Sequence, residues 1–179
     1  RKHRDLRPGQ KLAKALESLG PSFIKLGQSL ATRPDVIGDE IAEDLTELQD
    51  SLPPFSSSQA RKIIEAGLGQ PVSEIFAEFD DTPVAAASIA QVHFAVTRDG
   101  QQVAVKVLRP DIEKAFARDF DMFLWLARIA ERTAPTTRRL RPVDAVNTLA
   151  RSVAMEMDFR YEASAASELA ENMQTDPHY

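Results

Sequence analysis

The chain has 179 residues, no cysteine, 43% hydrophobic and 27% charged residues, and a formal net charge of −5. This composition is that of a soluble globular protein, and the lack of cysteine excludes disulfides, thiolate nucleophiles and cysteine-based metal sites. The sequence holds no run of about 18 apolar residues and therefore predicts no membrane-spanning helix and no signal peptide. Because both ends look cut, we expect the chain to be a fragment of a larger protein.

Charge is distributed unevenly along the chain. Residues 1–28 hold seven basic and two acidic side chains, whereas residues 35–81 hold twelve acidic and two basic ones. A basic arm of this kind can bind nucleic acid or anionic lipid. The arm lacks interleaved aromatic residues and the rest of the chain would repel a phosphate backbone, so the sequence argues against nucleic-acid binding.

Helical hairpins are the predicted structure of the first 70 residues. We expect Ser22 to cap the second helix and Ser57 or Ser58 to cap the fourth, because a serine hydroxyl can accept a hydrogen bond from a helix N-terminal amide. The segment SLPPFSSS, before the fourth helix, is predicted to be a linker. The third helix should turn its acidic residues outward. The predicted helices are approximately residues 8–19, 22–32, 38–50 and 58–66.

β-strand signals dominate residues 79–108. Apolar residues alternate over 92–96 and again over 103–107, on either side of a turn at Asp99-Gly100. This pattern predicts a β-hairpin with one buried face that carries the valines. Two long helices should follow, over about 111–132 and 142–171, so the order of elements indicates an α+β fold. The second of these should bury one face that consists of Val146, Leu149, Val153 and Met157.

Alternation also predicts the direction of Lys106. If Val105 and Val107 face the core, Ala104 and Lys106 lie on the opposite face. A small residue beside a lysine in mid-strand is typical of a nucleotide cleft, where the alanine leaves room for adenine and the lysine reaches the phosphates. A lysine on a solvated strand face is the alternative interpretation.

The segment PVAAASIAQVH stands where a phosphate-covering loop would precede this hairpin. Its small side chains allow a close approach of the backbone to phosphates, and alanine should make the loop stiffer than glycine would. An ordinary alanine-rich turn is the alternative. Further along, EMDFRYEA supplies carboxylates that could pair with the lysine. Asp158 and Glu162 should share one helix face, with Glu156 about 120° away from Glu162; solvated surface acids are the alternative.

The helix predicted within PSFIKLGQSLATRPD contains a glycine, which costs about 1 kcal/mol relative to alanine. Lys25 and Gln28 project together from this helix. Gly27 leaves a bare spot on the backbone beside them, where another element can come close. A solvated lysine and glutamine would not require such a spot.

Four motifs together resemble the UbiB family of atypical kinase-like proteins, also called the AarF or ADCK family: KLGQ at 25–28, AAASIAQVH at 85–93, VAVK at 103–106 and EMDFRYEA at 156–163. The resemblance covers nearly the whole chain in the correct order. It implies a helical extension over residues 1–70 and a kinase-like N-lobe over residues 71–179, with the C-lobe absent. The helix of Lys25 and Gln28 would lie over the cleft, with Gly27 tightly against it.

The same resemblance implies roles for individual residues. Lys106 would bind phosphate with Glu162 as its partner, and Ala104 would adjoin the nucleotide. Glu156 and Asp158 would form an E-x-D pair near Lys25. The nucleotide loop would consist of Ala85, Ala86, Ala87, Ser88, Ile89, Ala90 and Gln91.

For the complete protein, the resemblance implies an atypical kinase or ATPase that acts in ubiquinone (coenzyme Q) biosynthesis. ATP or ADP with Mg²⁺ is the expected cofactor, with metal ligands beyond residue 179 and no metal site in this chain. Expected partners are an isoprenoid lipid or quinone precursor and other ubiquinone-biosynthesis proteins. The implied location is cytoplasmic, with peripheral attachment to the inner membrane left open. The alternative is a non-catalytic module that binds nucleotide or isoprenoid lipid and regulates a quinone-biosynthesis complex.

Asp176-Pro177-His178 echoes the catalytic loop of this family but lacks its upstream histidine and any following asparagine. We therefore expect these residues to form a loop that leads to the next strand. Phosphoryl transfer also requires a catalytic aspartate and Mg²⁺ ligands. The chain alone should therefore hold half an active site and hydrolyse no ATP. His3, His93 and Trp125 show no partner pattern and are predicted to be surface or core residues.

Overall fold

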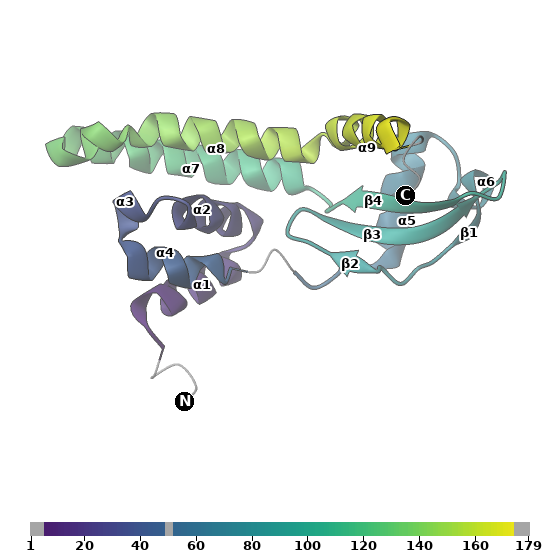
Figure 1. Ribbon diagram of the computed structural model, residues 1–179, viewed down its shortest axis with the longest axis horizontal. Helices are drawn as coiled ribbons and strands as arrows, with labels where there is room; N and C mark the ends of the chain where they lie inside the picture. Colours follow the sequence, from purple (N-terminus) through teal and green to yellow (C-terminus); the bar gives the residue numbers. More distant parts are fainter. Residues whose placement is uncertain (1–5, 49–51, 174–179) are drawn as a thin grey trace. The chain divides into compact units, whose positions relative to one another are not determined.

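The computed structural model describes residues 6–48 and 52–173. His3 and the Asp176-Pro177-His178 segment, which resembles the catalytic loop of the family, lie outside these ranges. The chain forms two compact units, Arg1–Met122 and Phe123–Tyr179. The first contains helices and a small antiparallel sheet, and the second is helical (Figure 1). The predicted α+β class is confirmed.

Four helices begin the first unit: α1 (Pro8–Leu19), α2 (Pro21–Ala31), α3 (Pro34–Ile37) and α4 (Asp39–Thr46). Proline stands in the first turn of α1, α2 and α3, where its missing amide hydrogen costs nothing and its fixed φ suits a helix. Pro34 accordingly begins α3. Apolar side chains of these helices form one core, which contains Ala13, Leu16, Leu45 and Leu48 with Phe23, Leu30, Ala31, Ile37 and Ile41 packed against it.

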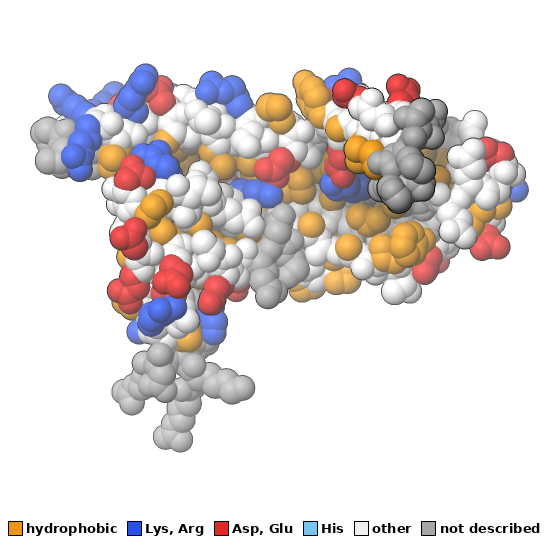
Figure 2. Space-filling view, viewed as in Figure 1, with side chains coloured by type: hydrophobic (Ala, Val, Ile, Leu, Met, Phe, Trp, Pro, Cys, Tyr) orange, Lys and Arg blue, Asp and Glu red, His pale blue; other side chains and the backbone are white. Residues whose placement is uncertain are grey.

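Acidic side chains cover the outer surface of α3 and α4, as Figure 2 shows. Asp44 is the exception, because it is 1% exposed and pairs with Arg7. α1 approaches this carboxylate closely: a Cβ atom on Gly9 would lie 2.6 Å from the Asp44 Cβ. Among the described residues of the predicted third helix, the outward orientation of the acids is thus correct except at Asp44, where α1 packs on α4, and Asp50 lies outside the described residues.

Two predicted helix caps are wrong. Ser22 does not cap α2; its Oγ donates a hydrogen bond to Asp119 Oδ2 at 2.7 Å, and Pro21 begins the helix instead. In α5 (Ser57–Leu68) the cap is Ser56, whose Oγ accepts the Gln59 amide at 3.4 Å. Three serines in a row offer three candidate caps, and the first of them has the extended backbone that an N-cap requires.

The sheet consists of β1 (Phe76–Phe79), β2 (Ala85–Ala86), β3 (Ala90–Thr97) and β4 (Gln102–Leu108), with the one-turn helix α6 (Val72–Ile75) before β1. β3 pairs antiparallel with each of the other three strands. Helix α5 covers one face of the sheet. The core between them contains Ala60, Ile64, Val72, Phe76, Ala95 and Val107, with Phe55, Ile63, Ile75, Phe79, Val103 and Val105 packed against it.

The prediction that all the hairpin valines share one buried face is wrong for β3. His93 pairs with Val105, whereas Phe94 pairs with Ala104. Opposite residues of antiparallel strands point to the same side of the sheet, so Val92, Phe94 and Val96 of β3 lie on the face away from α5. Phe94 is accordingly 57% exposed. The β3 side chains on the covered face are Gln91, His93 and Ala95.

Helix α7 (Ile112–Thr133) runs from the first unit into the second, where the 3₁₀ helix η1 (Pro135–Leu140), α8 (Pro142–Met157) and α9 (Phe159–Met173) follow. The single helix predicted over 142–171 is wrong, because the chain breaks at Asp158, where φ is −91° and ψ is 90°. Asp158 Oδ1 accepts the Arg160 amide at 3.1 Å and so caps α9. The buried face predicted for α8 is confirmed at Val153, which is 1% exposed.

Candidate functional site

Lys106 and Ala104 lie on the face of the sheet opposite α5. Both side chains are exposed, while Val107, on the covered face, is only 3% exposed. Across the hairpin, Lys106 stands opposite Val92 and Ala104 opposite Phe94. The alternation predicted for β4 is therefore confirmed, and a small residue and a cation lie side by side on an accessible surface.

A hollow of ≈ 530 Å³ opens over Ala104 on this face. This volume lies within the range of about 300–1,000 Å³ that is common for small-molecule sites. Phe94 and Val96 give it apolar walls, and Glu78 and Asp80 add carboxylates. Carboxylates repel phosphate, so the hollow suits an uncharged ring, whereas Lys106, about 7 Å further along the strand, suits an anion. These two properties together fit a nucleotide.

The alanine-rich segment forms a tight connection between β2 and β3. Ala85 pairs with Val92 and Ala86 with Gln91, and the Ala87 amide donates to the Ala90 carbonyl at 2.7 Å. Only the first part of the segment reaches the surface: Ala85 is exposed, and Ala86 and Ala87 are partly buried. The side chains of Ser88, Ile89, Ala90 and Gln91 are buried.

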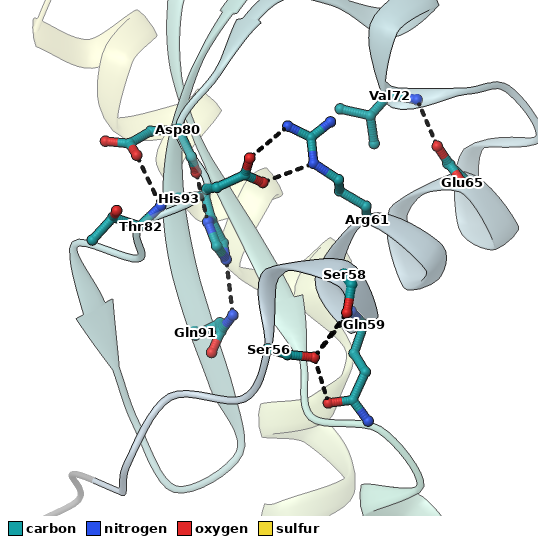
Figure 3. Close-up of polar contacts among 11 residues, drawn as sticks. Ser56, Ser58, Gln59, Arg61, Glu65, Val72, Asp80, Thr82, Gln91 and His93 are labelled. Atoms are coloured by element: carbon teal, nitrogen blue, oxygen red, sulfur yellow. Dashed lines mark hydrogen bonds and ion pairs between the residues drawn. The ribbon is translucent and has the colours of Figure 1, made fainter.

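Gln91 and His93 form a buried polar chain beneath this loop (Figure 3). His93 Nδ1 lies 2.8 Å from the Asp80 carbonyl oxygen, which can only accept, so Nδ1 carries the proton. Gln91 Nε2 then donates to His93 Nε2 at 2.9 Å. Both side chains are 0% exposed. This bonding holds the imidazole as the neutral Nδ1–H tautomer.

Phe79 extends the contacts of His93 toward α5. The two rings stack with centroids 5.0 Å apart. The Arg61 guanidinium, from α5, lies 4.9 Å from the centroid of the Phe79 ring. Arg61 Nε also pairs with Asp81 Oδ1 at 2.7 Å, and this hydrogen bond lowers the pKa of Asp81. Helix α5 is thereby joined to the segment that follows β1.

Sequence reasoning missed the structural importance of two residues. His93 was predicted to have no partner pattern, yet its buried side chain has two hydrogen-bond partners, Gln91 and the Asp80 carbonyl. Arg109 received no role from the sequence, yet its guanidinium donates to three carbonyl groups. The local sequence offers no signal for Arg109, because its acceptors are main-chain atoms distant in sequence.

The K-x-G-Q residues lie on α2. Lys25 and Gln28 are partly buried, and Gly27 is buried. A Cβ atom on Gly27 would lie 2.4 Å from Leu48 Cδ1 and 2.7 Å from Leu16 Cδ1. The expected close approach is present, but its partners are α1 and the segment after α4 within the helical core, and not the cleft. The glycine therefore allows α1, α2 and the segment after α4 to pack together.

The acidic motif is divided between two helices of the second unit. Glu156 lies in α8, Asp158 at the break, and Glu162 in the first turn of α9. The expectation that Asp158 and Glu162 share one face of a single helix, with Glu156 about 120° away from Glu162, is therefore wrong. Asp158 pairs with Arg160, and the hydrogen bond from Arg160 lowers the pKa of Asp158. Pairing of Lys106 with Glu162, and of Lys25 with the E-x-D acids, would join the two units and stays a prediction.

Neither a membrane-spanning helix nor a cluster of metal ligands occurs in the described part of the chain. No helix among residues 6–48 and 52–173 is long and apolar enough to cross a membrane. Within the same residues, no group of three or more histidine, aspartate or glutamate side chains is placed to hold a metal ion.

Comparison with known proteins identifies the family. The ABC1 atypical kinase-like domain matches residues 47–179. A protein of Marinobacter nauticus named "Probable protein kinase UbiB" is 48% identical over 169 residues, which are 94% of this chain and 31% of that protein. Its namesake in Pseudomonas fluorescens strain SBW25 is 44% identical over 177 residues, 99% of this chain and 33% of that protein. The chain thus spans about a third of the length of these relatives.

A solved structure is also similar. The complex of Rv3197 with erythromycin from Mycobacterium tuberculosis matches with a TM-score of 0.57 and 31% sequence identity, over 93% of this chain and 42% of that one. The kinase-like fold expected from the motifs is confirmed, and the chain belongs to the UbiB (ABC1) family of atypical kinase-like proteins.

Proposed function

We propose that the exposed face of the sheet binds ATP or ADP, and that the complete protein is an atypical kinase or ATPase in ubiquinone biosynthesis. The observation that carries this proposal is the placement of Ala104 and Lys106 together on an accessible strand face, beside a hollow of ≈ 530 Å³. Membership of a kinase-like family supports it.

In this proposal the residues of the exposed sheet face and of the alanine-rich loop have different roles. Ala104 and Phe94 would contact the base, because one is small and the other offers an exposed aromatic ring. Lys106 would neutralise phosphate oxygens, with Glu162 as its carboxylate partner. In the loop, the accessible residues Ala85, Ala86 and Ala87 would approach the phosphates. The buried residues 88–91 would support the loop from beneath.

Bound ATP, with Mg²⁺, would supply the phosphoryl group that is transferred or hydrolysed. Residues 1–70 would act as the helical extension, with Lys25 and Gln28 over the cleft, and residues 71–179 as the kinase-like part. The E-x-D pair, Glu156 and Asp158, would bind near Lys25. The proposed partners are a quinone precursor or isoprenoid lipid and other proteins of ubiquinone biosynthesis, with peripheral attachment at the inner membrane.

Substitution of Ala104 by leucine in the complete protein tests the base site without a change in charge. We expect Ala104→Leu to fill the hollow and to weaken binding of a fluorescent ATP analogue by at least about tenfold. Ala66→Leu, at an exposed position of α5, is the matched control and should bind normally. Equal binding by both variants would remove the nucleotide from this face.

The partner of Lys106 can be tested with two acids of the same helix. Glu162→Gln should strongly reduce ATP hydrolysis by the complete protein, whereas Glu171→Gln, also exposed on α9, should be near neutral. The same effect in both variants would show that Glu162 is not the partner.

A second candidate is the binding of a bulky apolar ligand that regulates a quinone-biosynthesis complex. It is favoured by Phe94, which is 57% exposed in the wall of the hollow, and by the similar structure, which was solved in complex with erythromycin. If this candidate is correct, an isoprenoid quinone should compete with the ATP analogue or bind in its place. Undiminished analogue binding at saturating quinone would exclude a shared site.

A further inference from the structure

Arg109 lies directly after β4, and the acceptors described for its guanidinium are all main-chain carbonyl oxygens. Nε and Nη2 donate to the Ala87 oxygen at 3.0 and 2.8 Å, and Nη2 also donates to Pro53 at 3.0 Å and to Leu52 at 3.2 Å. Its own amide donates to the Ile89 carbonyl at 2.9 Å. One side chain therefore bonds the alanine-rich loop and the linker at the same time.

Gln91 forms hydrogen bonds with Phe55, in the next part of the same linker. Its Oε1 accepts the Phe55 amide at 3.0 Å, and its Nε2 donates to the Phe55 carbonyl at 3.3 Å. The Arg109 guanidinium also lies 5.8 Å from the centroid of the Phe55 ring. Residues 52–55 are thus bonded by two side chains: Gln91, which belongs to the alanine-rich loop, and Arg109, which binds that loop. We name Gln91 and Arg109 the linker clasp.

The linker is the stretch of chain that connects the K-x-G-Q helices to α5 and the sheet. From these contacts we propose that Arg109 is a positioning residue that couples the alanine-rich loop to this linker, so that a displacement of one displaces the other. The proposal rests on the proposed function, in which Ala85, Ala86 and Ala87 approach the phosphates. Through the clasp, nucleotide at the loop would hold the linker, and the linker would set the affinity of the loop for nucleotide.

Arginine is required at this position because of its geometry and not only because of its charge. Its planar guanidinium presents several donors in a fixed fork and can reach two chain segments together. Burial lowers the pKa of Arg109, but the group starts so far above neutrality that it stays charged. A lysine would keep the charge but not the fork. Arg109→Lys should therefore show whether the coupling depends on the geometry of the guanidinium or only on its positive charge.

Arg98 provides a matched control within the same hairpin. It is exposed, and it also donates to main-chain carbonyls, at Glu74 with a distance of 3.3 Å and at Ser73. Those acceptors belong to α6 and not to the linker or the alanine-rich loop. Arg98→Lys thus removes the same kind of interaction at a place where the proposal expects no coupling.

Hydrogen–deuterium exchange of the complete protein tests the coupling without nucleotide. In Arg109→Lys, the amides of Leu52, Phe55 and Ser56 in the linker and those of residues 85–91 should exchange faster together, by about tenfold. This is the equivalent of one lost hydrogen bond to a charged group. Arg98→Lys should leave both segments at wild-type rates, and a thermal melt should show Arg109→Lys still folded. Faster exchange in the loop alone, or in neither segment, would overturn the proposal.

Adding an ATP analogue tests the direction toward the nucleotide. In the wild type the analogue should slow exchange at 52–56, and Arg109→Lys should lose this protection. Its KM for ATP should rise by about tenfold with little change in kcat, because a positioning residue acts on binding. Protection of the linker that persists in Arg109→Lys would overturn the proposal. If the wild type binds no analogue, the proposed function fails, and the exchange rates without nucleotide still decide whether loop and linker are coupled.

Discussion

The two faces of the sheet differ in what covers them. On one face, α5 packs on Phe76, Ala95 and Val107, and the polar side chains beneath it are bonded to one another or to backbone. On the other face, Phe94 is 57% exposed and Lys106 is exposed. Both faces are built from the same strands with the same alternation, so the pattern of residues does not tell which face is the core. The covered face carries stability, and the exposed face is available to a ligand.

The largest effect is expected on the exposed face, at Lys106. Because we place this cation at the phosphates, Lys106→Ala in the complete protein should reduce ATP hydrolysis on the order of 100-fold or more. Its melting temperature should stay near that of the wild type, since an exposed side chain contributes little to stability. Steady-state hydrolysis and a thermal melt measure the two quantities. Lys62→Ala, exposed on α5, is the charge-matched control and should hydrolyse normally.

Two phenylalanines allow the faces to be compared directly. Phe76 is 8% exposed in the core, and Phe94 is 57% exposed. Phe76→Ala should reduce the free energy of unfolding by about 3–5 kcal/mol, because it leaves a cavity. Phe94→Ala should change it by less than about 0.5 kcal/mol and should weaken nucleotide binding instead. Denaturant unfolding and analogue binding measure both variants. A comparable loss of stability in the two would show that the exposed face is also part of the core.

The prediction of the fold succeeded where a local pattern decides it. The helix predicted over 8–19 has the bounds found, and the one predicted over 58–66 lies within α5. The outward direction of Lys106 follows from alternation in β4. The face of β3 was predicted wrongly because apolar residues alternate on the exposed side, while Gln91 and His93 are buried. Burial of those polar residues depends on Phe55 and Asp80, which are distant in sequence, so a single strand cannot reveal it.

The break at Asp158 was missed for a different reason. Helical periodicity continues on both sides of it, and α8 and α9 each have an apolar face. The aspartate was interpreted as a functional acid, although aspartate is also a preferred helix cap. The candidate site has the same limit. Sequence placed Ala104 and Lys106 on one strand face, but it could not show Arg109 at the carbonyls of Leu52 and Ala87.

A pair of helical glycines extends the comparison of covered and exposed positions. A Cβ atom on Gly27 would lie closer to Leu16 and Leu48 than van der Waals contact allows. A Cβ atom on Gly67 of α5 would meet nothing within 4 Å. Gly27→Leu should therefore cost about 1–3 kcal/mol through overpacking, despite the better helix propensity of leucine. Gly67→Leu should stabilise by up to about 0.8 kcal/mol.

Thermal melts of the two glycine variants, with and without ATP, provide the measurement. Gly27→Ala should fall between them, because the two atoms that its Cβ would meet are the ends of flexible leucine side chains. If the helix of Lys25 and Gln28 also lies over the cleft, Gly27→Leu should change nucleotide affinity, and Gly67→Leu should not. A Gly27→Leu protein that melts above the wild type would contradict the packing at this position.

The smallest effect is expected at a polar contact that is open to solvent, the cap of α9. The hydrogen bond from Arg160 lowers the pKa of Asp158 from its ordinary value of 3.8. A carboxylate whose pKa is lower in the folded state stabilises that state above its unfolded pKa, and the contribution is lost as the pH falls through the folded value. The first turn of α9 should therefore loosen only below pH 3.8. The pH dependence of the Arg160 amide chemical shift, measured by NMR, reports this transition, and its midpoint should lie below that value. Asp158→Asn keeps a capping side chain without a charge, so it should retain the helix and lose the transition. A midpoint at or above the ordinary value would show that the pair with Arg160 does not form in solution.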